Sequence, residues 1–269
     1  MKLLSALLPL IAWPLVLSAQ STVTDSFSGN SGLWEADVTT GGGAFTISGG
    51  VLNFTSGALS TGNTASAQRD WTASLSAAAN WSARVDLGTG ATMVAGQITR
   101  WTFIAAALTN PSPDDYLSGQ VVHSYQQDPF RTILGTPYIN GAAGTTDQSS
   151  ANAAMITFLF SFDATTHLLT LSYDTDGVTG TDNFTTLTTV NTATAWGLTS
   201  SDNFGLRLMA SNVANGMPSS AFGDGVMTAD NFSTTVAVPE PSTAAALCGT
   251  LALLTALWRR RADNNAPMR

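Results

Sequence analysis

The sequence predicts an all-β protein whose body, residues 22–236, folds as a β-sandwich or jelly roll. Short apolar or alternating segments recur along the body and are separated by clusters of Gly, Asn, Asp and Ser. No long helical period, coiled-coil heptad or fixed-length repeat stands out. Threonine is abundant, and its β-branched side chain suits the solvated face of a strand. We expect roughly nine to thirteen short strands, which is typical of sandwiches and jelly rolls.

The sequence pattern predicts four strands in the first half of the body. Residues 44–47 and 51–54 flank a Ser-Gly-Gly turn and predict a hairpin. Residues 81–87 alternate between apolar and polar side chains, as a half-buried strand does. Residues 102–108 are almost continuously apolar and predict a central strand. A helical turn around residues 70–79 is the one exception that we expect.

The second half carries the clearest hairpin, at residues 155–176. Residues 155–162 predict a central strand with four apolar side chains on one face: Ile156, Phe158, Phe160 and Phe162. A turn at residues 163–166 leads to a returning strand, which again places four side chains on one face: His167, Leu169, Leu171 and Tyr173. Residues 203–210 and 226–236 supply two further strands.

The body is acidic and contains few charged residues. Between Thr22 and Ala237 there are five Arg, no Lys and 16 Asp or Glu, which gives a net charge of −11. Such a surface repels polyphosphates, so we expect no nucleic-acid partner. The absence of Lys from the body excludes a phosphate-binding loop lysine and a Schiff-base lysine there. The single Cys of the chain, Cys248, excludes an intramolecular disulfide and a structural zinc–thiolate site.

Both ends of the sequence carry targeting features. Residues 1–20 combine one positive charge at Lys2, an apolar stretch and then small residues, the pattern of a secretory signal peptide that is cleaved. At the other end the uncharged residues 243–258 predict a transmembrane helix. We expect the arginines that follow this helix to stay on the cytoplasmic side of the membrane, which places the body on the opposite side of the membrane. The alternative for each end is a plain membrane anchor that is retained.

The order of features in residues 237–269 resembles the PEP-CTERM sorting signal of exopolysaccharide-producing Gram-negative bacteria. A Pro-Glu-Pro motif precedes the apolar helix and an arginine triplet follows it, at Val238, Pro239, Glu240, Pro241, Arg259, Arg260 and Arg261. The resemblance implies that an exosortase, a membrane cysteine transpeptidase, cleaves near the motif after the secretion machinery has exported the chain. It therefore implies a transient inner-membrane anchor and a final place at the cell surface or in the extracellular (biofilm) matrix. The tail beyond the arginines is longer than is usual in this family.

The body is also similar, more weakly, to concanavalin A-like or laminin-G-like jelly rolls. Residues 25–29 before Trp34, with Gly-Gly-Val-Leu at residues 49–52, resemble the opening of that fold. Residues 162–171 are similar to paired back-sheet strands of lectin-like sandwiches, and residues 229–232 resemble a closing strand. The resemblance implies two packed antiparallel sheets.

The body shows no catalytic motif, so we expect that it is not an enzyme. A glycoside hydrolase needs two carboxylates that flank the scissile bond. The glucanase branch of the lectin-like fold carries two Glu and one Asp that alternate along one strand, whereas Glu35 is the only Glu of this body. The only histidines are His123 and His167, and no Gly-x-Ser-x-Gly motif accompanies them. A hydrolase on a lectin-like scaffold is the third interpretation of the body.

Calcium is the one cofactor that the sequence suggests. Asp174 and Asp176 alternate before a glycine, and Asp182 follows, so three carboxylates are placed to converge on a hard cation. The glutamate that an EF-hand loop requires is replaced by Thr185. The alternative is a hairpin turn with solvated aspartates.

Aromatic residues supply the remaining binding candidates. Flat rings stack on sugar faces, and neighbouring Asp and Asn side chains can bond to sugar hydroxyls. The candidates for sugar binding are Trp71, Trp81, Trp101 and Tyr116, with Tyr125 and Tyr138 in the same stretch. The alternative is that these rings belong to the core. The sequence thus predicts an exported structural or adhesive module associated with exopolysaccharide, and as the alternative a carbohydrate-binding, lectin-like module, with or without calcium.

Overall fold

The structure is a computed structural model that describes residues 19–90, 93–108, 114–176 and 182–238. Ser21–Val236 form one compact unit. Residues 1–20 and 237–269 belong to a second unit, nearly all of which lies outside the described residues. The predicted signal peptide, transmembrane helix and arginine triplet therefore stay predictions, as does the Pro-Glu-Pro motif. No helix among the described residues is long and apolar enough to cross a membrane.

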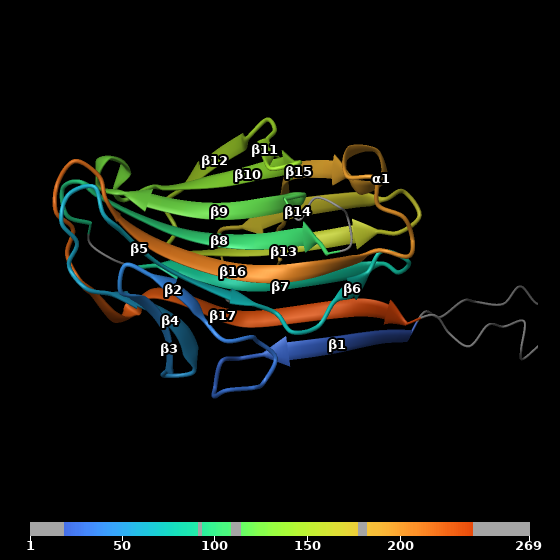
Figure 1. The fold of residues 1–269 in the computed structure, drawn as a ribbon, viewed down its shortest axis with the longest axis horizontal. Coiled ribbons are helices and arrows are strands. Elements are labelled where there is room, and N and C mark those ends of the chain that lie inside the picture. Colours follow the sequence, from blue (N-terminus) through green and yellow to red (C-terminus); the bar gives the residue numbers. More distant parts are fainter. Residues whose placement is uncertain (1–18, 91–92, 109–113, 177–181, 239–269) are drawn as a thin grey trace, which may run out of the picture. The chain divides into compact units, whose positions relative to one another are not determined.

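Two antiparallel sheets make up the compact unit, and Figure 1 shows their long strands lying in two layers. The eight-stranded sheet has the following strands in spatial order, with β1 (Ala19–Asp25) added beside β17: β15 (Thr185–Asn191), β14 (Leu168–Asp174), β13 (Met155–Asp163), β7 (Trp81–Thr89), β17 (Phe222–Val238), β4 (Val51–Ser56) and β3 (Gly43–Ser48). Consecutive strands of this order run antiparallel.

The nine-stranded sheet carries the other layer. Its strands in spatial order are β11 (Ala142–Ala143), β10 (Arg131–Ile139), β9 (Tyr116–Ser124), β8 (Gln97–Ala107), β16 (Asn203–Ala214), β5 (Thr64–Asp70) and β2 (Val38–Thr40). β12 (Asp147–Ala151) pairs with β10, and β6 (Leu75–Ser76) pairs with β16. The described residues contain only two short helices, η1 (Tyr125–Gln127) and α1 (Thr192–Ala195). The predicted all-β sandwich is thereby confirmed.

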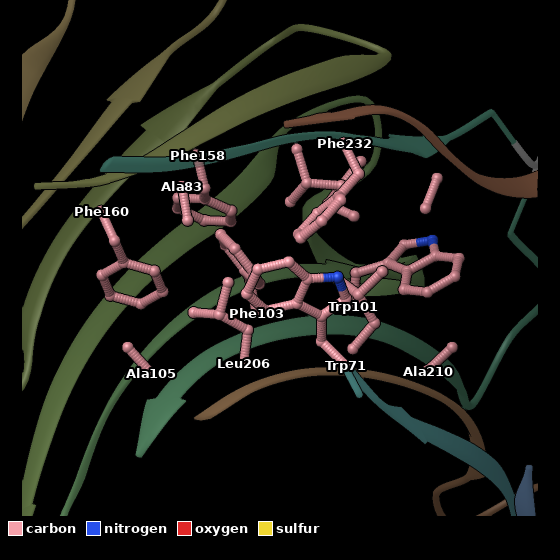
Figure 2. Close-up of a cluster of buried hydrophobic side chains, with 14 of the residues drawn as sticks. Trp71, Ala83, Trp101, Phe103, Ala105, Phe158, Phe160, Leu206, Ala210 and Phe232 are labelled. Atoms are coloured by element: carbon pink, nitrogen blue, oxygen red, sulfur yellow. The ribbon is translucent and has the colours of Figure 1, made fainter. Parts of the chain in front are cut away.

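Aromatic side chains from both sheets meet between the layers and form the core (Figure 2). Phe103 on β8 contacts Phe160 on β13, with 4.9 Å between the ring centroids. Trp81 on β7 meets Phe204 on β16 edge to face at 5.1 Å. Each pair joins one sheet to the other, and burial of rings of this size contributes about 1.5–3 kcal/mol per side chain. The period-2 alternation of each strand therefore brings its apolar side chains to the contact between the sheets.

Most of the predicted strands are present with small changes in their ends. The expected hairpin is β3 and β4, joined at residues 49–50. The four apolar side chains predicted for one face of β13 are all buried, and so are Leu169 and Leu171 on β14. His167 lies in the turn before β14 with a φ of 55°, not in the strand. The described residues hold 17 strands, more than predicted, because several are edge strands of two or three residues.

The predicted helical turn at residues 70–79 is wrong. The backbone N–H of Trp71 donates to the carbonyl of Leu206 at 2.9 Å, and that of Thr72 donates to the carbonyl of Leu33 at 2.9 Å. A helix would direct such bonds to the fourth preceding residue. Here neighbouring strands supply the partners, because the segment continues β5 and then forms β6 at the sheet edge.

The face of the nine-stranded sheet that points away from the core is called the outer face below. Along β16 every second residue is buried, and the buried ones include Phe204, Leu206 and Leu208 of the core. The alternate residues of β16 therefore lie on the outer face, and the strand register extends that face across β8, β9 and β10.

Candidate functional site

The three tryptophans predicted to bind sugar lie in the core. Trp101 is fully buried, stacks on Phe45 with ring centroids 5.7 Å apart, and donates its indole N–H to the carbonyl of Gly88 at 3.1 Å. Trp71 and Trp81 are exposed by only 7% and 3%. Figure 2 shows Trp71 and Trp101 among the core side chains. A ring that is enclosed by protein has no face left for a sugar, so the three tryptophans serve packing and not stacking on a ligand.

Tyr116, the fourth candidate, lies on the outer face at one end of β9. It stacks on Tyr138 of β10, with centroids 4.2 Å apart and ring planes inclined by 15°. Burial raises the pKa of the Tyr116 phenol to about 12, and the neighbouring Tyr138 raises it further in the same direction. Both rings are half-buried, and each covers a face of the other, so this pair offers mainly ring edges and hydroxyl groups.

The aspartates predicted to bind calcium are engaged with protein groups. Burial would raise the pKa of Asp174, but backbone N–H groups of Asn183 and Asp176 donate to its carboxylate and hold the pKa below its usual value. The bond to Asp174 raises the pKa of Asp176. Asp182 accepts from the guanidinium of Arg84 at 2.9 and 3.0 Å.

These contacts do not form a calcium-binding cage. Ca²⁺ takes six to eight oxygen ligands, and among the described residues no group of three His, Cys, Asp or Glu is placed to hold a metal ion. Residues 177–181 lie outside the described part of the chain. The calcium hypothesis therefore stays a prediction that rests on the sequence alone.

A hollow of about 360 Å³ lies where β8 begins, β9 ends and β16 ends, and we call it the end hollow. Its lining residues come from three loops and the adjoining strand ends: Ala95, Gly96, Gln97, Ile98, Ser124, Tyr125, Gln126, Asn215, Gly216 and Met217. Ile98, Ser124 and Val213 are aligned across these strands on the outer face. The end hollow is therefore continuous with the outer face.

Two of the three loops are held together through Gly96. Its carbonyl accepts from the backbone N–H of Asn215 at 2.7 Å, and its φ is 77°. A Cβ atom at this position would lie 2.6 Å from the Cβ of Met217 and 2.9 Å from the carbonyl oxygen of Asn215. Glycine is required here for both the left-handed backbone and the close approach.

The floor of the end hollow is fixed by a buried amide. Gln97 is exposed by only 1%, and its side chain accepts from the backbone N–H of Val94 at 3.2 Å. Its amide nitrogen donates to Asn212 and to the carbonyl of Ser220, each at 3.4 Å. One side chain thus connects the two loops that Gly96 brings together, so the walls are set before any ligand arrives.

The third loop, residues 125–130, is supported from within the sandwich. Buried His123 bonds through Nε2 to Asp128 at 2.9 Å, and burial lowers the pKa of this imidazole. The guanidinium of Arg131 donates to the carbonyl of Pro129, and also to the carbonyl of Thr89 at 2.6 Å. Thr132 donates to the Gln127 side chain at 2.6 Å. These bonds leave Tyr125 outside the core and presented to solvent.

The exposed groups of the end hollow combine one aromatic ring with amides and an apolar side chain. Tyr125 is exposed by 50% and Met217 by 52%, and Gln126 and Asn215 are exposed beside them. Amide side chains offer donors and acceptors together. None of the described lining residues is Asp or Glu, so these residues do not supply the acid pair that glycoside hydrolysis needs.

Two other hollows contain charged groups that already pair with each other. One of about 640 Å³ is lined by Trp34, Glu35 and Asp37, and Arg69 there bonds to Asp37 at 2.6 Å. Another of about 200 Å³ contains Asp70 and Arg207, whose ion pair measures 2.5 Å. In each of these hollows the arginine is already bonded to an aspartate and is not available for a ligand. The end hollow is therefore the better candidate for a ligand site.

Comparisons with known proteins agree with the fold. No family model and no curated protein matches the sequence. Among solved structures, the chain is similar to the CBM2 module of the evolved Dit of Lactobacillus casei BL23 phage J-1, with 12% identity over 81% of this chain and 98% of that one and a TM-score of 0.54. It is also similar to an endo-1,3-beta-glucanase from Streptomyces sioyaensis, with 14% identity over 85% and 100% and a TM-score of 0.53.

The comparison with a lectin structure gives the same result. Lectin UEA-II in complex with galactose is 14% identical over 81% of this chain and 99% of that chain, with a TM-score of 0.52. The body is a lectin-like jelly roll. At this level of identity the likeness describes the fold, which several activities share, and the function has to be argued from the site.

Proposed function

We propose that the body binds carbohydrate and that the end hollow is its primary binding site. The observation that carries the proposal is the half-exposed ring of Tyr125, which stands beside exposed amides in a hollow of about 360 Å³. An aromatic face accepts the apolar C–H face of a sugar, and amides bond its hydroxyls. Small-molecule sites commonly combine a concave apolar lining with a few polar groups in this way.

Lectin-like neighbours support the same proposal by analogy. The lectin cited above was solved with galactose, and another neighbour is the CBM2 module of a phage Dit. The glucanase among the neighbours keeps hydrolysis as the alternative. We favour binding without turnover, because the end hollow has no carboxylate among its described lining residues.

The experiment titrates the purified protein with a panel of neutral and acidic polysaccharides, with calcium and with chelator. We expect saturable binding to at least one glycan, and an affinity at least about tenfold lower for Tyr125→Ala. Phe130→Ala is the matched control, because Phe130 is equally exposed at 52% in the same loop but does not line the hollow. Flat titrations on every glycan would contradict the proposed function, and release of reducing ends would favour the hydrolase.

We further propose that the protein is exported and sorted by an exosortase through residues 237–269, so that the body reaches exopolysaccharide at the cell surface. This part rests on the sequence pattern of Pro239-Glu240-Pro241 and the arginine triplet. The intact mass of the mature protein tests it. The proposal expects a mass that lacks residues 1–20 and the arginine-containing tail. Recovery of residues 259–269 on the mature form would contradict it.

A further inference from the structure

The outer face carries one cation that no other described residue neutralises. Three of the five arginines of the body are paired with aspartates: Arg69 with Asp37, Arg84 with Asp182, and Arg207 with Asp70. Arg131 is buried and bonds to Thr89 and to the carbonyl of Pro129. Among the described residues Arg100 is the remaining arginine; it is exposed, and no ion pair or hydrogen bond of its side chain is formed.

The strand register defines what surrounds Arg100. On β8 its neighbours on the same face are Ile98 and Thr102, and directly across from it lie Val122 on β9 and Ser211 on β16. The four diagonal positions complete a block of nine outer-face residues, and they are occupied by Gln120, Ser124, Met209 and Val213. No position in this block is acidic, although the body as a whole carries a net charge of −11.

The block adjoins the end hollow. Ile98 and Ser124 belong to both, and Arg100 stands two residues along β8 from Ile98. Two residues of a strand span about 7 Å, a distance that the long arginine side chain covers. A glycan that stacks on Tyr125 and continues along the outer face therefore passes within reach of the guanidinium.

We infer that the glycan bound by this protein is anionic, and that Arg100 is the residue that selects for its charge. The inference rests on the proposed carbohydrate-binding function and names the ligand class. A guanidinium binds a carboxylate or a sulfate with two parallel charge-assisted hydrogen bonds. The shared chemistry is an oxyanion on the sugar, which a uronic acid or a sulfate ester supplies.

The acidic body does not prevent this binding at physiological salt. At 0.15 M ionic strength the Debye length is about 8 Å, so exposed charges farther away are largely screened. An oxyanion that reaches Arg100 meets a block of outer-face residues without carboxylates, while the other four arginines of the body are ion-paired with an aspartate or buried. The arrangement favours capture of an anionic chain at one place.

The test compares matched pairs of polysaccharides on the purified protein: polygalacturonate with its carboxyl-reduced form, and dextran sulfate with dextran. We expect the charged member of at least one pair to bind with an affinity at least about tenfold higher than that of its neutral partner. The pair that shows the preference identifies the oxyanion. Arg100→Gln is expected to abolish the preference and leave binding of the neutral member unchanged.

Arg84→Gln is the matched control, because it removes the same charge from the eight-stranded sheet and should keep the preference. Equal binding of charged and neutral members, or a preference that survives Arg100→Gln, would overturn the inference. If Tyr125→Ala still weakens binding in those cases, carbohydrate binding stands and only the choice of an anionic ligand fails. Absence of saturable binding to all four polysaccharides would overturn both proposals.

Discussion

The indole N–H of Trp34 donates to the carboxylate of Asp25 over 2.9 Å and so ties the loop after β1 to the end of that strand. The same carboxylate accepts from the backbone N–H of Phe27 at 2.8 Å and from the hydroxyl of Ser31 at 2.7 Å. Phe27, which has a φ of 49°, stacks on Trp34 with centroids 6.0 Å apart. One buried carboxylate therefore holds a left-handed backbone and two aromatic rings over the core.

Removal of this carboxylate should destabilise the sandwich strongly. Asp25→Ala leaves three donors without their acceptor in a region where Asp25 is exposed by only 6%, and we expect the free energy of unfolding to fall by roughly 3 kcal/mol. Asp25→Asn keeps one acceptor oxygen and should lose about half as much. Urea denaturation followed by tryptophan fluorescence measures both values.

Asp224 provides a control for the loss of side-chain bonds at the surface. It accepts from Thr46 at 2.9 Å and from Ser48 at 2.5 Å, and these bonds lower its pKa. Because this carboxylate is solvated, Asp224→Ala should destabilise the protein much less than Asp25→Ala does. Equal losses for the two variants would show that the Asp25 network has no special role.

The sequence predicted the central strands well because burial on one face enforces a period of two. In β13 the four buried side chains at every second position, Ile156, Phe158, Phe160 and Phe162, left one register for the strand. Edge strands such as β11 escaped prediction, because two residues carry no period. The turn at residues 70–79 was misassigned for a related reason, since its backbone bonds go to strands that are distant in the sequence.

The candidate site was harder to predict than the fold. The sequence marks Trp101 and Tyr125 alike as aromatic residues, yet one is fully buried and the other is exposed by 50%. Only the pairing of strands decides which ring faces the other sheet and which stands on a loop. Likewise the sequence does not distinguish Arg100 from Arg84, because the aspartate that pairs with Arg84 is Asp182, 98 residues further along the chain.

Gly96 should be essential to the end hollow. Gly96→Ala introduces a Cβ atom 2.6 Å from that of Met217 at a φ of 77°, so the two loops must separate. We expect a loss of stability of at least about 1–2 kcal/mol from the backbone conformation alone, and more from the clash. Glycan binding should weaken together with stability, and thermal unfolding and titration measure the two effects.

Gly216→Ala is the matched variant for the same backbone conformation. Gly216 also has a φ of 77°, but a Cβ atom there would meet nothing within 4 Å. Gly216→Ala should therefore lower the stability only by the cost of the left-handed backbone conformation, about 1–2 kcal/mol. The end hollow should be preserved. If both variants bind glycan equally well, the close approach of the loops is not needed for the site.

The stacked pair of Tyr116 and Tyr138 should make the stability of the protein fall with rising pH in the alkaline range. Burial raises the pKa of Tyr116 to about 12, and Tyr138 adds to the shift, whereas in the unfolded chain a tyrosine ionises near 10. Between these values the folded protein holds a proton that the unfolded chain has lost, so this group makes stability fall as pH rises from about 10 to 12. Ultraviolet titration of Tyr138→Phe should show the Tyr116 pKa move part of the way towards 10, and an unchanged titration would contradict the coupling.

His123 should make the protein less stable in mild acid. Its side chain is fully buried, and burial lowers the pKa from its ordinary value near 6.5, although the bond to Asp128 opposes the shift and nearby Arg131 adds to it. Below about pH 6.5 the unfolded chain takes up a proton that the folded protein resists. The contribution of this group to stability is therefore complete above pH 6.5 and is lost as pH falls through the lowered pKa.

The measurement is the urea midpoint between pH 7.5 and pH 5 for the wild-type protein and for His123→Gln. Glutamine can still donate to Asp128 but does not titrate, so the variant should lose less stability over this range than the wild type. Glycan binding by the two proteins over the same pH range is a second measurement, because Asp128, the partner of His123, belongs to the loop that carries Tyr125. If the two proteins lose stability in parallel, carboxylates and not His123 account for the acid sensitivity.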